Sequence, residues 1–88
     1  MAVGGQLRVP ENIVVYVRPN CPECDEVVRY LENRGLHFRV RDVERDPDAQ
    51  EDLDALGYSD VPVTFLDEVA VVGFDANILD ASLVHITM

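Results

Sequence analysis

Basic residues are scarce in this sequence of 88 residues, in which Lys and Arg together number 7 against 17 Asp and Glu. The formal net charge of -10 at pH 7 argues against nucleic acid and anionic membrane surfaces as partners, because phosphate binding depends on basic side chains. Any docking surface should therefore suit a basic partner. The alternative is that the acidity only keeps a small domain in solution.

Long hydrophobic runs are also missing. The apolar stretches are of the size of Ile13–Val17, far below the ~20 residues that a membrane-spanning helix needs. Residues 1–10 lack the basic start, apolar centre and small-residue exit of a secretory signal. With 48% hydrophobic and 27% charged residues, the composition is that of a globular protein. We predict a cytoplasmic protein with a flexible lead-in over residues 1–10 and one domain over residues 11–88.

Potential metal ligands are few, since the chain holds 2 cysteines and 2 histidines. A structural zinc site usually takes four ligands in two close pairs, whereas His37 and His85 stand far from the cysteines and from each other. We therefore predict no metal site and treat both histidines as surface residues. In the cytoplasm a lone cysteine pair is more often catalytic or metal-binding than a structural disulfide, and two inert core cysteines are the alternative.

The two cysteines, Cys21 and Cys24, stand in a Cys-Pro-Glu-Cys motif that follows the apolar run Ile13–Val17. That run predicts a central strand covered on both faces, and Pro22 suits the first position of a helix that we expect to reach Asn33. The apolar spacing along this helix puts one thiol on the buried side and the other at the exposed N-terminus. A strand, a short loop and a helix that opens with Cys-x-x-Cys are typical of a thiol–disulfide redox site. The buried stripe of the helix comprises Cys24, Val27, Val28 and Leu31.

The rest of the chain alternates between strand and helix patterns, which gives the order β-α-β-α-β-β-α and an α/β fold. The first two strands should be parallel because a helix connects them, and the last two should form an antiparallel hairpin. The hairpin loop should exceed two residues, because Asp67-Glu68 lacks the glycine that tight turns prefer. After a first helix closed by Gly35, the predicted elements are a strand at 38–41, a helix from Asp46-Pro47 to Gly57, strands at 61–66 and 69–74, and a helix capped by Asp75. The side chains expected to face the core are Phe38, Val40, Ala49, Leu53, Leu56, Ile78, Leu79 and Leu83.

This element order, with Cys-Pro-x-Cys at the first helix and Val61-Pro62-Val63 before the third strand, resembles the glutaredoxin branch of the thioredoxin fold. The resemblance covers about residues 12–84 and implies a four-stranded mixed sheet flanked by helices. The stretch Val71-Val72-Gly73-Phe74-Asp75 is similar to the small bacterial glutaredoxin-like redoxins, a group near those that feed electrons to ribonucleotide reductase.

The resemblance also implies roles for individual residues. Cys21 would be the nucleophile, Cys24 the resolving thiol, and Pro62 a cis proline whose neighbour Val61 offers backbone hydrogen bonds to a cysteinyl peptide. In glutathione-using relatives, a basic residue three before the nucleophile and the turn after the fourth strand hold the carboxylates of the tripeptide. The implied substrate-binding residues are Arg18, Pro22, Val61, Pro62, Gly73, Phe74 and Asp75. The alternatives from the residues alone are a trans proline at a strand start, a core position for Phe74, and a plain helix cap for Asp75.

The chain departs from the glutathione-binding pattern at several positions. Tyr58-Ser59-Asp60 stands where glutaredoxins usually supply Gln, Arg and Thr, and Gly73 alone is left of the usual glycine pair. Asp60 would repel the carboxylates of glutathione, and it could equally serve solubility alone. The reductant is therefore either glutathione or a thioredoxin reductase that uses NADPH, and the missing carboxylate binders favour the reductase.

Opposing charges surround the proposed nucleophile. The helix N-terminus and Arg18 lower the pKa of the Cys21 thiol, whereas the carboxylates of Glu23, Asp25 and Glu26 in the first turn raise it. We therefore expect a smaller depression of that pKa than in a basic redoxin. Glu23 could also be an ordinary early-helix residue that faces water.

Together these features predict a monomeric dithiol oxidoreductase that reduces protein disulfides or glutathione mixed disulfides and binds no cofactor. Two other classes of function stay open. One is a glutathione-dependent iron–sulfur cluster carrier, for which Cys24 would be dispensable. The other is a non-catalytic interaction domain of the thioredoxin fold, in which both cysteines are vestigial.

Overall fold

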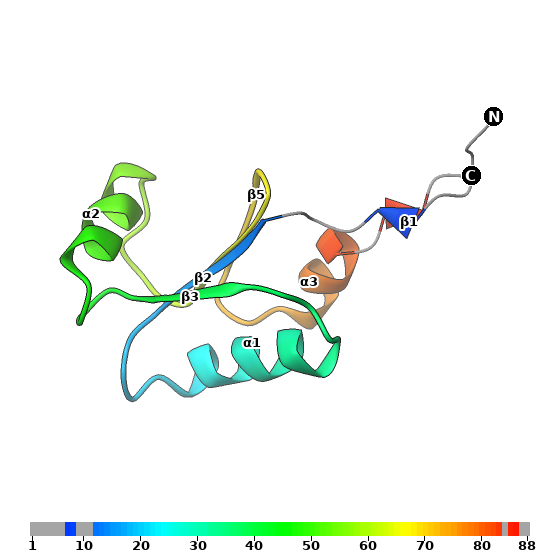
Figure 1. Cartoon of the computed structure of the whole chain (residues 1–88), viewed down its shortest axis with the longest axis horizontal. Helices are drawn as coiled ribbons and strands as arrows, with labels where there is room; N and C mark the ends of the chain where they lie inside the picture. The colour runs from blue at the N-terminus through cyan, green and yellow to red at the C-terminus, as the bar shows by residue number, and fades with distance from the viewer. Residues whose placement is uncertain (1–6, 9–11, 84, 87–88) are drawn as a thin grey trace.

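The computed structural model describes residues 7–8, 12–83 and 85–86 of the chain. A four-stranded sheet lies at its centre, with the strands in the order β3-β2-β4-β5 (Figure 1). Strand β2 pairs in parallel with β3 and antiparallel with β4, and β4 forms an antiparallel hairpin with β5. This is the mixed sheet that the sequence predicts. The strands are β2 (Ile13–Val17), β3 (Arg39–Asp42), β4 (Val63–Leu66) and β5 (Val69–Val72).

Three helices cover the sheet. Helices α1 (Pro22–Asn33) and α3 (Ala76–Leu83) lie on one face, and α2 (Pro47–Ala55) lies on the other (Figure 1). Because successive side chains of a strand point to opposite faces, Val15 packs on the α1 and α3 side while Tyr16 packs on the α2 side. The central strand is thus covered on both faces, as its continuous apolar sequence predicts.

The helix limits follow from local signals in the sequence. Cys21 is the N-cap of α1 and Pro22 its first residue, where the missing proline N–H costs no hydrogen bond. The helix ends where Gly35 adopts a φ of 68°, which lets the N–H of Leu36 bond to the carbonyl of Leu31 at 3.3 Å. Asp46 caps α2 through a 3.0 Å hydrogen bond from the N–H of Asp48.

Three apolar side chains predicted to face the core are about half exposed: Val40 is 49% exposed, Leu56 50% and Ile78 48%. Val40 lies on β3. This is an edge strand of the four-stranded sheet, so it has a neighbouring strand on one side only. Leu56 is the C-cap of α2, beyond the part of the helix that packs on the sheet. Ile78 precedes Leu79, and it is Leu79, with no exposed surface, that faces the core.

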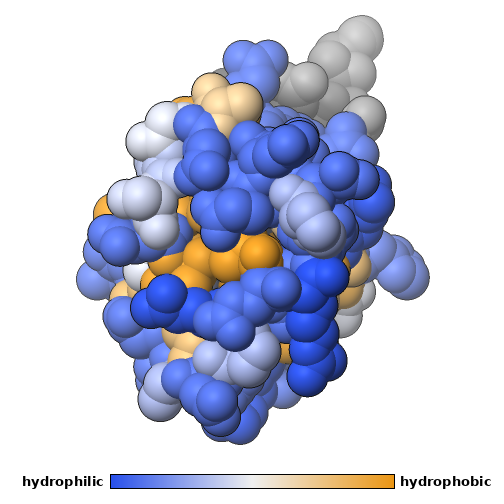
Figure 2. Space-filling view, turned by 90° about the vertical axis from the view of Figure 1, so that its left-hand side faces the viewer, coloured by the Kyte–Doolittle hydropathy of each residue, from blue (hydrophilic) through white to orange (hydrophobic). Residues whose placement is uncertain are grey.

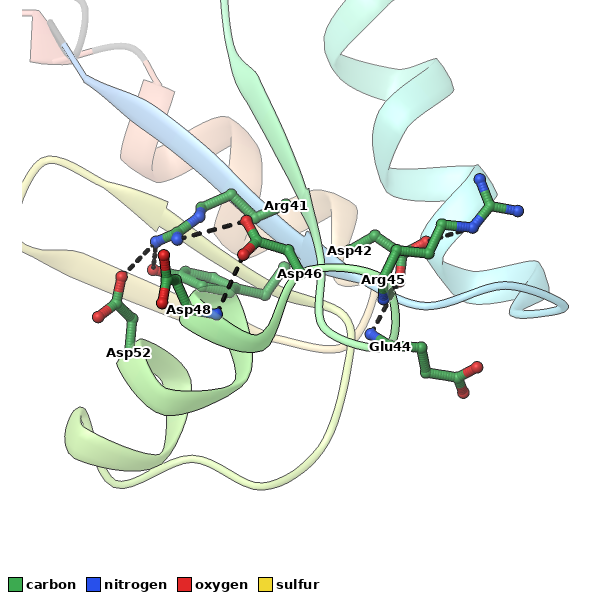
Figure 3. A network of polar contacts seen from close by, with 8 residues as sticks. Arg41, Asp42, Glu44, Arg45, Asp46, Asp48 and Asp52 are labelled. Carbon is green, nitrogen blue, oxygen red and sulfur yellow. Dashed lines mark hydrogen bonds and ion pairs between the residues drawn. The ribbon is translucent and has the colours of Figure 1, made fainter.

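Arg41 is the centre of a polar network between β3, α2 and β2 (Figure 3). Its guanidinium lies 2.5 Å from Asp52 and 3.6 Å from Asp46, and it donates a 3.4 Å hydrogen bond to the hydroxyl of Tyr16. The hydrogen bond to Asp52 is the main reason that the pKa of Arg41 is raised. These contacts hold α2 against the edge strand.

The hairpin loop is shorter than the sequence predicts. Leu66 pairs directly with Val69, so Asp67 and Glu68 alone form the turn. Asp67 takes the positive φ of 56° that a glycine would otherwise supply, and its carboxylate accepts a 2.9 Å hydrogen bond from the N–H of Asn12. Aspartate tolerates this conformation better than most residues, which is why the two-residue turn forms without glycine.

Two short strands were not predicted. β1 (Leu7–Arg8) pairs antiparallel with β6 (His85–Ile86), and they form a sheet of their own beyond α3 (Figure 1). The other residues of the predicted lead-in, 1–6 and 9–10, lie outside the described part of the chain. Of the helices in the described ranges, none is long and apolar enough to cross a bilayer.

Candidate active site

Cys21 stands just beyond the carboxyl end of β2, where a short loop turns the chain into α1. In that loop Asn20 has a φ of 58°, a conformation that asparagine adopts more readily than most residues. Figure 2 views the molecule from the side on which this loop and α2 lie in Figure 1. It shows a hollow with hydrophobic surface between hydrophilic rims on this side of the molecule.

A disulfide joins Cys21 and Cys24, whose Cα atoms are 5.2 Å apart. Cys24 is only 2% exposed and belongs to the core between α1 and the sheet, whereas Cys21 is partly exposed at the helix N-terminus. The sequence predicted this difference from the apolar spacing along α1. An external reagent therefore reaches the sulfur of Cys21 more readily than that of Cys24.

The backbone of α1 places hydrogen-bond donors at the Cys21 sulfur. The N–H of Cys24 donates to Sγ of Cys21 at 3.1 Å, so the cysteine side chain caps the helix. The free N–H groups of a helix N-terminus favour a negative charge there. Three carboxylates are expected to disfavour that charge, and all three are exposed in this part of α1: Glu23, Asp25 and Glu26.

Arg18 is exposed and borders a groove between α1 and the edge strand β3. The same groove is lined by Val17, Cys24, Val28 and Val40. Arg18 and the buried Cys24 therefore border the same groove. Arg18 takes part in none of the ion pairs found among the described residues.

The Val61–Pro62 peptide bond is cis, as the resemblance implied. Pro62 is buried immediately before β4, and its carbonyl accepts a 2.8 Å hydrogen bond from the N–H of Gly73. Gly73 has a φ of 76°, and a Cβ atom added to it would lie 3.7 Å from Oε2 of Glu23. The proline loop, the end of β5 and the first turn of α1 thus meet at one place.

The other two residues of the Gly73–Asp75 turn have structural contacts. The ring of Phe74 packs edge-on against Tyr30, with 5.8 Å between ring centroids, and joins the core beside α1. Asp75 caps α3 by accepting a 3.2 Å hydrogen bond from the N–H of Ile78. These are the core and cap roles that the residues alone suggested. A contact of either side chain with substrate stays a prediction.

Sequence reasoning missed a cluster that ties α3 to α1. The hydroxyl of Tyr30 donates to the carboxylate of Asp80, and the guanidinium of Arg34 lies 4.2 Å from the Tyr30 ring centroid and 2.6 Å from the Asp80 carboxylate. Burial raises the pKa of Tyr30, and the hydrogen bond to Asp80 adds to the rise while Arg34 opposes it. Only the four-residue spacing of Tyr30 and Arg34 on a helix could have indicated part of this cluster.

The segment that departs from the glutathione-binding pattern lies between α2 and β4. Asp60 is exposed there, while the ring of Tyr58 packs edge-on against Phe65 at 5.7 Å on the α2 side of the sheet. Within the described ranges, no three His, Cys, Asp or Glu side chains are grouped so that they could hold a metal ion. His37 is exposed.

A model of the glutaredoxin family matches residues 13–71, from the first residue of β2 into β5. This chain belongs to the glutaredoxin family. It is 34% identical over 68 residues to the glutaredoxin-like protein NrdH of Escherichia coli K12, a match that covers 77% of this chain and 84% of the relative. Family membership makes the protein a thiol–disulfide oxidoreductase with Cys21 and Cys24 as its redox-active pair.

Solved structures of similar proteins share the fold. The NrdH-redoxin of Escherichia coli, described as having a thioredoxin-like activity profile, superposes with a TM-score of 0.72 at 33% identity, over 78% of this chain and 91% of that one. The thioredoxin-like protein BC3987 gives a TM-score of 0.74 at 32% identity, over 82% of this chain and all (100%) of that one. The predicted glutaredoxin-type thioredoxin fold is thereby confirmed.

Proposed function

We propose that this protein reduces disulfides of other proteins, with Cys21 as the nucleophile and Cys24 as the resolving thiol. The observation that carries the proposal is the contrast between the two cysteines. Cys21 is partly exposed and accepts a hydrogen bond from the helix N-terminus, whereas Cys24 is 2% exposed and within bonding distance of it. An accessible thiolate attacks first, and a buried neighbour completes the exchange.

The reaction begins when the Cys21 thiolate attacks one sulfur of a substrate disulfide. A mixed disulfide forms, and the other substrate sulfur leaves as a thiolate that takes a proton from water. Cys24, after losing its proton, then attacks Sγ of Cys21 and displaces the second substrate sulfur. Two electrons have passed to the substrate, and the protein is left with the Cys21–Cys24 disulfide, which is the state of this structure.

The substrate chain lies, in this proposal, across the place where the proline loop, Gly73 and the start of α1 meet. Val61 offers its backbone next to Pro62, and Gly73 leaves space because it has no side chain. The cysteines stand at the same end of α1 as Glu23, whose carboxylate reaches Gly73. The proposed substrate-binding residues are Arg18, Pro22, Val61, Pro62, Gly73, Phe74 and Asp75.

As reductant we propose a thioredoxin reductase that uses NADPH, in preference to glutathione. Asp75 already caps α3, and the exposed Asp60 replaces a neutral residue of the glutathione-binding pattern. Carboxylates at these positions disfavour a ligand that itself carries carboxylates. The similar NrdH-redoxin has a thioredoxin-like activity profile, which supports the same choice. We further propose that the protein acts as a monomer in the cytoplasm, where dithiols are kept reduced.

A coupled assay tests this proposal. The oxidised protein is mixed with NADPH and thioredoxin reductase, or with NADPH, glutathione and glutathione reductase, and a protein disulfide such as insulin serves as the final acceptor. We expect NADPH consumption that depends on this protein only in the first mixture, and none with the variant Cys21→Ser. Consumption only with glutathione would contradict the proposed reductant. Turnover by Cys21→Ser would contradict the assignment of the nucleophile.

The two alternative functions predict different results in simple experiments. An iron–sulfur carrier should give a coloured product after anaerobic reconstitution with iron, sulfide and glutathione, and we expect a colourless one. A domain with vestigial cysteines should show no reversible disulfide, whereas this pair is joined. We expect mass spectrometry to show that oxidation of the reduced protein removes the mass of two hydrogen atoms, that is two protons and two electrons, and that reduction restores it.

A further inference from the structure

The carboxylate of Glu23 occupies a position that no partner in the described part of the chain explains. Glu23 is the second residue of α1 and is exposed, and its Oε2 lies 3.7 Å from the place where a Cβ atom of Gly73 would stand. Neither the ion pairs nor the side-chain hydrogen bonds of the described residues include it. Its charge is therefore not paired with a cation of the described residues, and the N-terminus of α1 is what favours it beside the cysteine pair.

The neighbours of this carboxylate place it where a bound substrate would pass. Gly73 is tied to Pro62 by a 2.8 Å hydrogen bond, so the Glu23 carboxylate stands beside the proline loop as well as beside the start of α1. Cys21, the N-cap, comes two positions before Glu23 in the chain. A residue joined by a disulfide to Cys21 and lying towards the proline loop would have its flanking groups close to this charge.

The charges around the cysteine pair are unevenly placed. Asp60 precedes Val61 and is exposed, so it adds a second negative charge near the proline loop. Arg18 borders the groove between α1 and β3, together with Asp25 and Arg29. Three other cations, Arg34, Arg41 and Arg45, form ion pairs away from the cysteines. The surface in Figure 2 is mostly hydrophilic around one hydrophobic hollow.

We propose that Glu23 determines substrate specificity, because its carboxylate favours disulfides whose cysteine is flanked by a cationic side chain and disfavours those flanked by a carboxylate. The inference rests on the proposed function, since it concerns the substrate of the same cysteine pair. It adds the substrate class: cysteines in basic segments of proteins, in preference to small disulfides that carry carboxylates. Coulomb attraction between exposed charges is modest and screened by salt, so selection should be strongest at low ionic strength.

The test uses three peptides of one sequence, each carrying a cysteine in mixed disulfide with a neutral thiol, and differing only in Lys, Gln or Glu next to the cysteine. Rates of reduction by the reduced protein are measured for the parent, Glu23→Gln and Glu23→Lys. A matched control is Glu51→Gln, which removes the same charge from an exposed position of α2 on the opposite face of the sheet. Ratios of rates are compared, because a changed reactivity of Cys21 affects all three peptides alike.

For the parent and the control we expect the Lys peptide to react about two- to tenfold faster than the Glu peptide at low salt. The ratio should fall towards one in Glu23→Gln and invert in Glu23→Lys. Equal rates in the parent, or equal loss of preference in Glu51→Gln and Glu23→Gln, would overturn the role of Glu23 while leaving the proposed function intact. Failure of the parent to reduce even the Gln peptide would instead overturn the proposed function, and this inference with it.

Discussion

The backbone N–H of Cys24 donates a 3.1 Å hydrogen bond to Sγ of Cys21. One residue thus supplies both the donor that favours a negative charge on the exposed sulfur and the thiol that later displaces the substrate from it. Because Cys24 is fixed in the core by α1, the donor and the thiol keep their positions while the substrate changes. The two roles can be separated, since a substitution of the side chain leaves the backbone donor in place.

Replacing Cys24 by Ser should therefore trap the reaction halfway. The Cys21 thiolate still attacks the substrate, but no thiol is left to resolve the mixed disulfide. We expect non-reducing mass spectrometry to show a covalent complex between Cys24→Ser and the peptide or protein substrate, and none with Cys21→Ser. If Cys24→Ser released a protein substrate as fast as the parent does, Cys24 would not be the resolving thiol.

Arg18 provides a second test of the charges at the site. Its removal in Arg18→Gln should raise the pH at which half of the Cys21 thiol reacts with iodoacetamide, because a nearby cation stabilises the thiolate. Arg18 is exposed, so the rise should be small, roughly 0.2–0.7 of a pH unit. Arg39→Gln is the control, since Arg39 is exposed at the far end of β3, opposite Val14. An equal rise in both variants would mean that only net charge matters.

The local parts of the fold could be predicted because their causes are adjacent in the sequence. Pro22 and Gly35 mark the ends of α1, and Asp46 and Asp75 cap the two later helices. The difference in burial between the two cysteines follows from the same helical spacing. The cis bond before Pro62 was implied by family resemblance, since the local residues would also fit a trans proline.

What could not be predicted depends on contacts between distant parts of the chain. Val40 is half exposed because β3 lies at the edge of the sheet. The apolar pattern of a single strand does not predict its position in the strand order. The contact of Tyr30 with Asp80 joins residues 50 positions apart, and neither side chain has a distinctive local setting. The position of the Glu23 carboxylate beside Gly73 likewise depends on a contact between the end of β5 and the first turn of α1, which are far apart in the sequence.

Tyr30 should titrate at a higher pH than an ordinary tyrosine. Burial and the hydrogen bond to Asp80 raise its pKa above the usual 10.0, with Arg34 acting in the opposite direction. Since the pKa is higher in the folded protein than in the unfolded chain, this residue contributes stability below pH ~10 that is lost as the pH rises through the folded pKa. Absorbance at alkaline pH should show a late phenolate component that disappears in Tyr30→Phe. Unchanged titration curves for this variant would contradict the assignment.

The free energy of unfolding should depend far more on Leu31 than on Leu56. Leu31 has no exposed surface and packs in the core beside Val27, whereas Leu56 is 50% exposed at the C-cap of α2. We expect Leu31→Ala to lower the free energy of unfolding by about 2–5 kcal/mol, because it removes buried methyl groups and leaves a cavity. Leu56→Ala should cost less than about 1 kcal/mol, since half of its side chain is already in water. Urea denaturation of the oxidised proteins measures both. If Leu31→Ala does not fold, Val27→Ala tests the same core with a smaller cavity, and a midpoint no lower than that of Leu56→Ala would contradict the packing of α1 on the sheet.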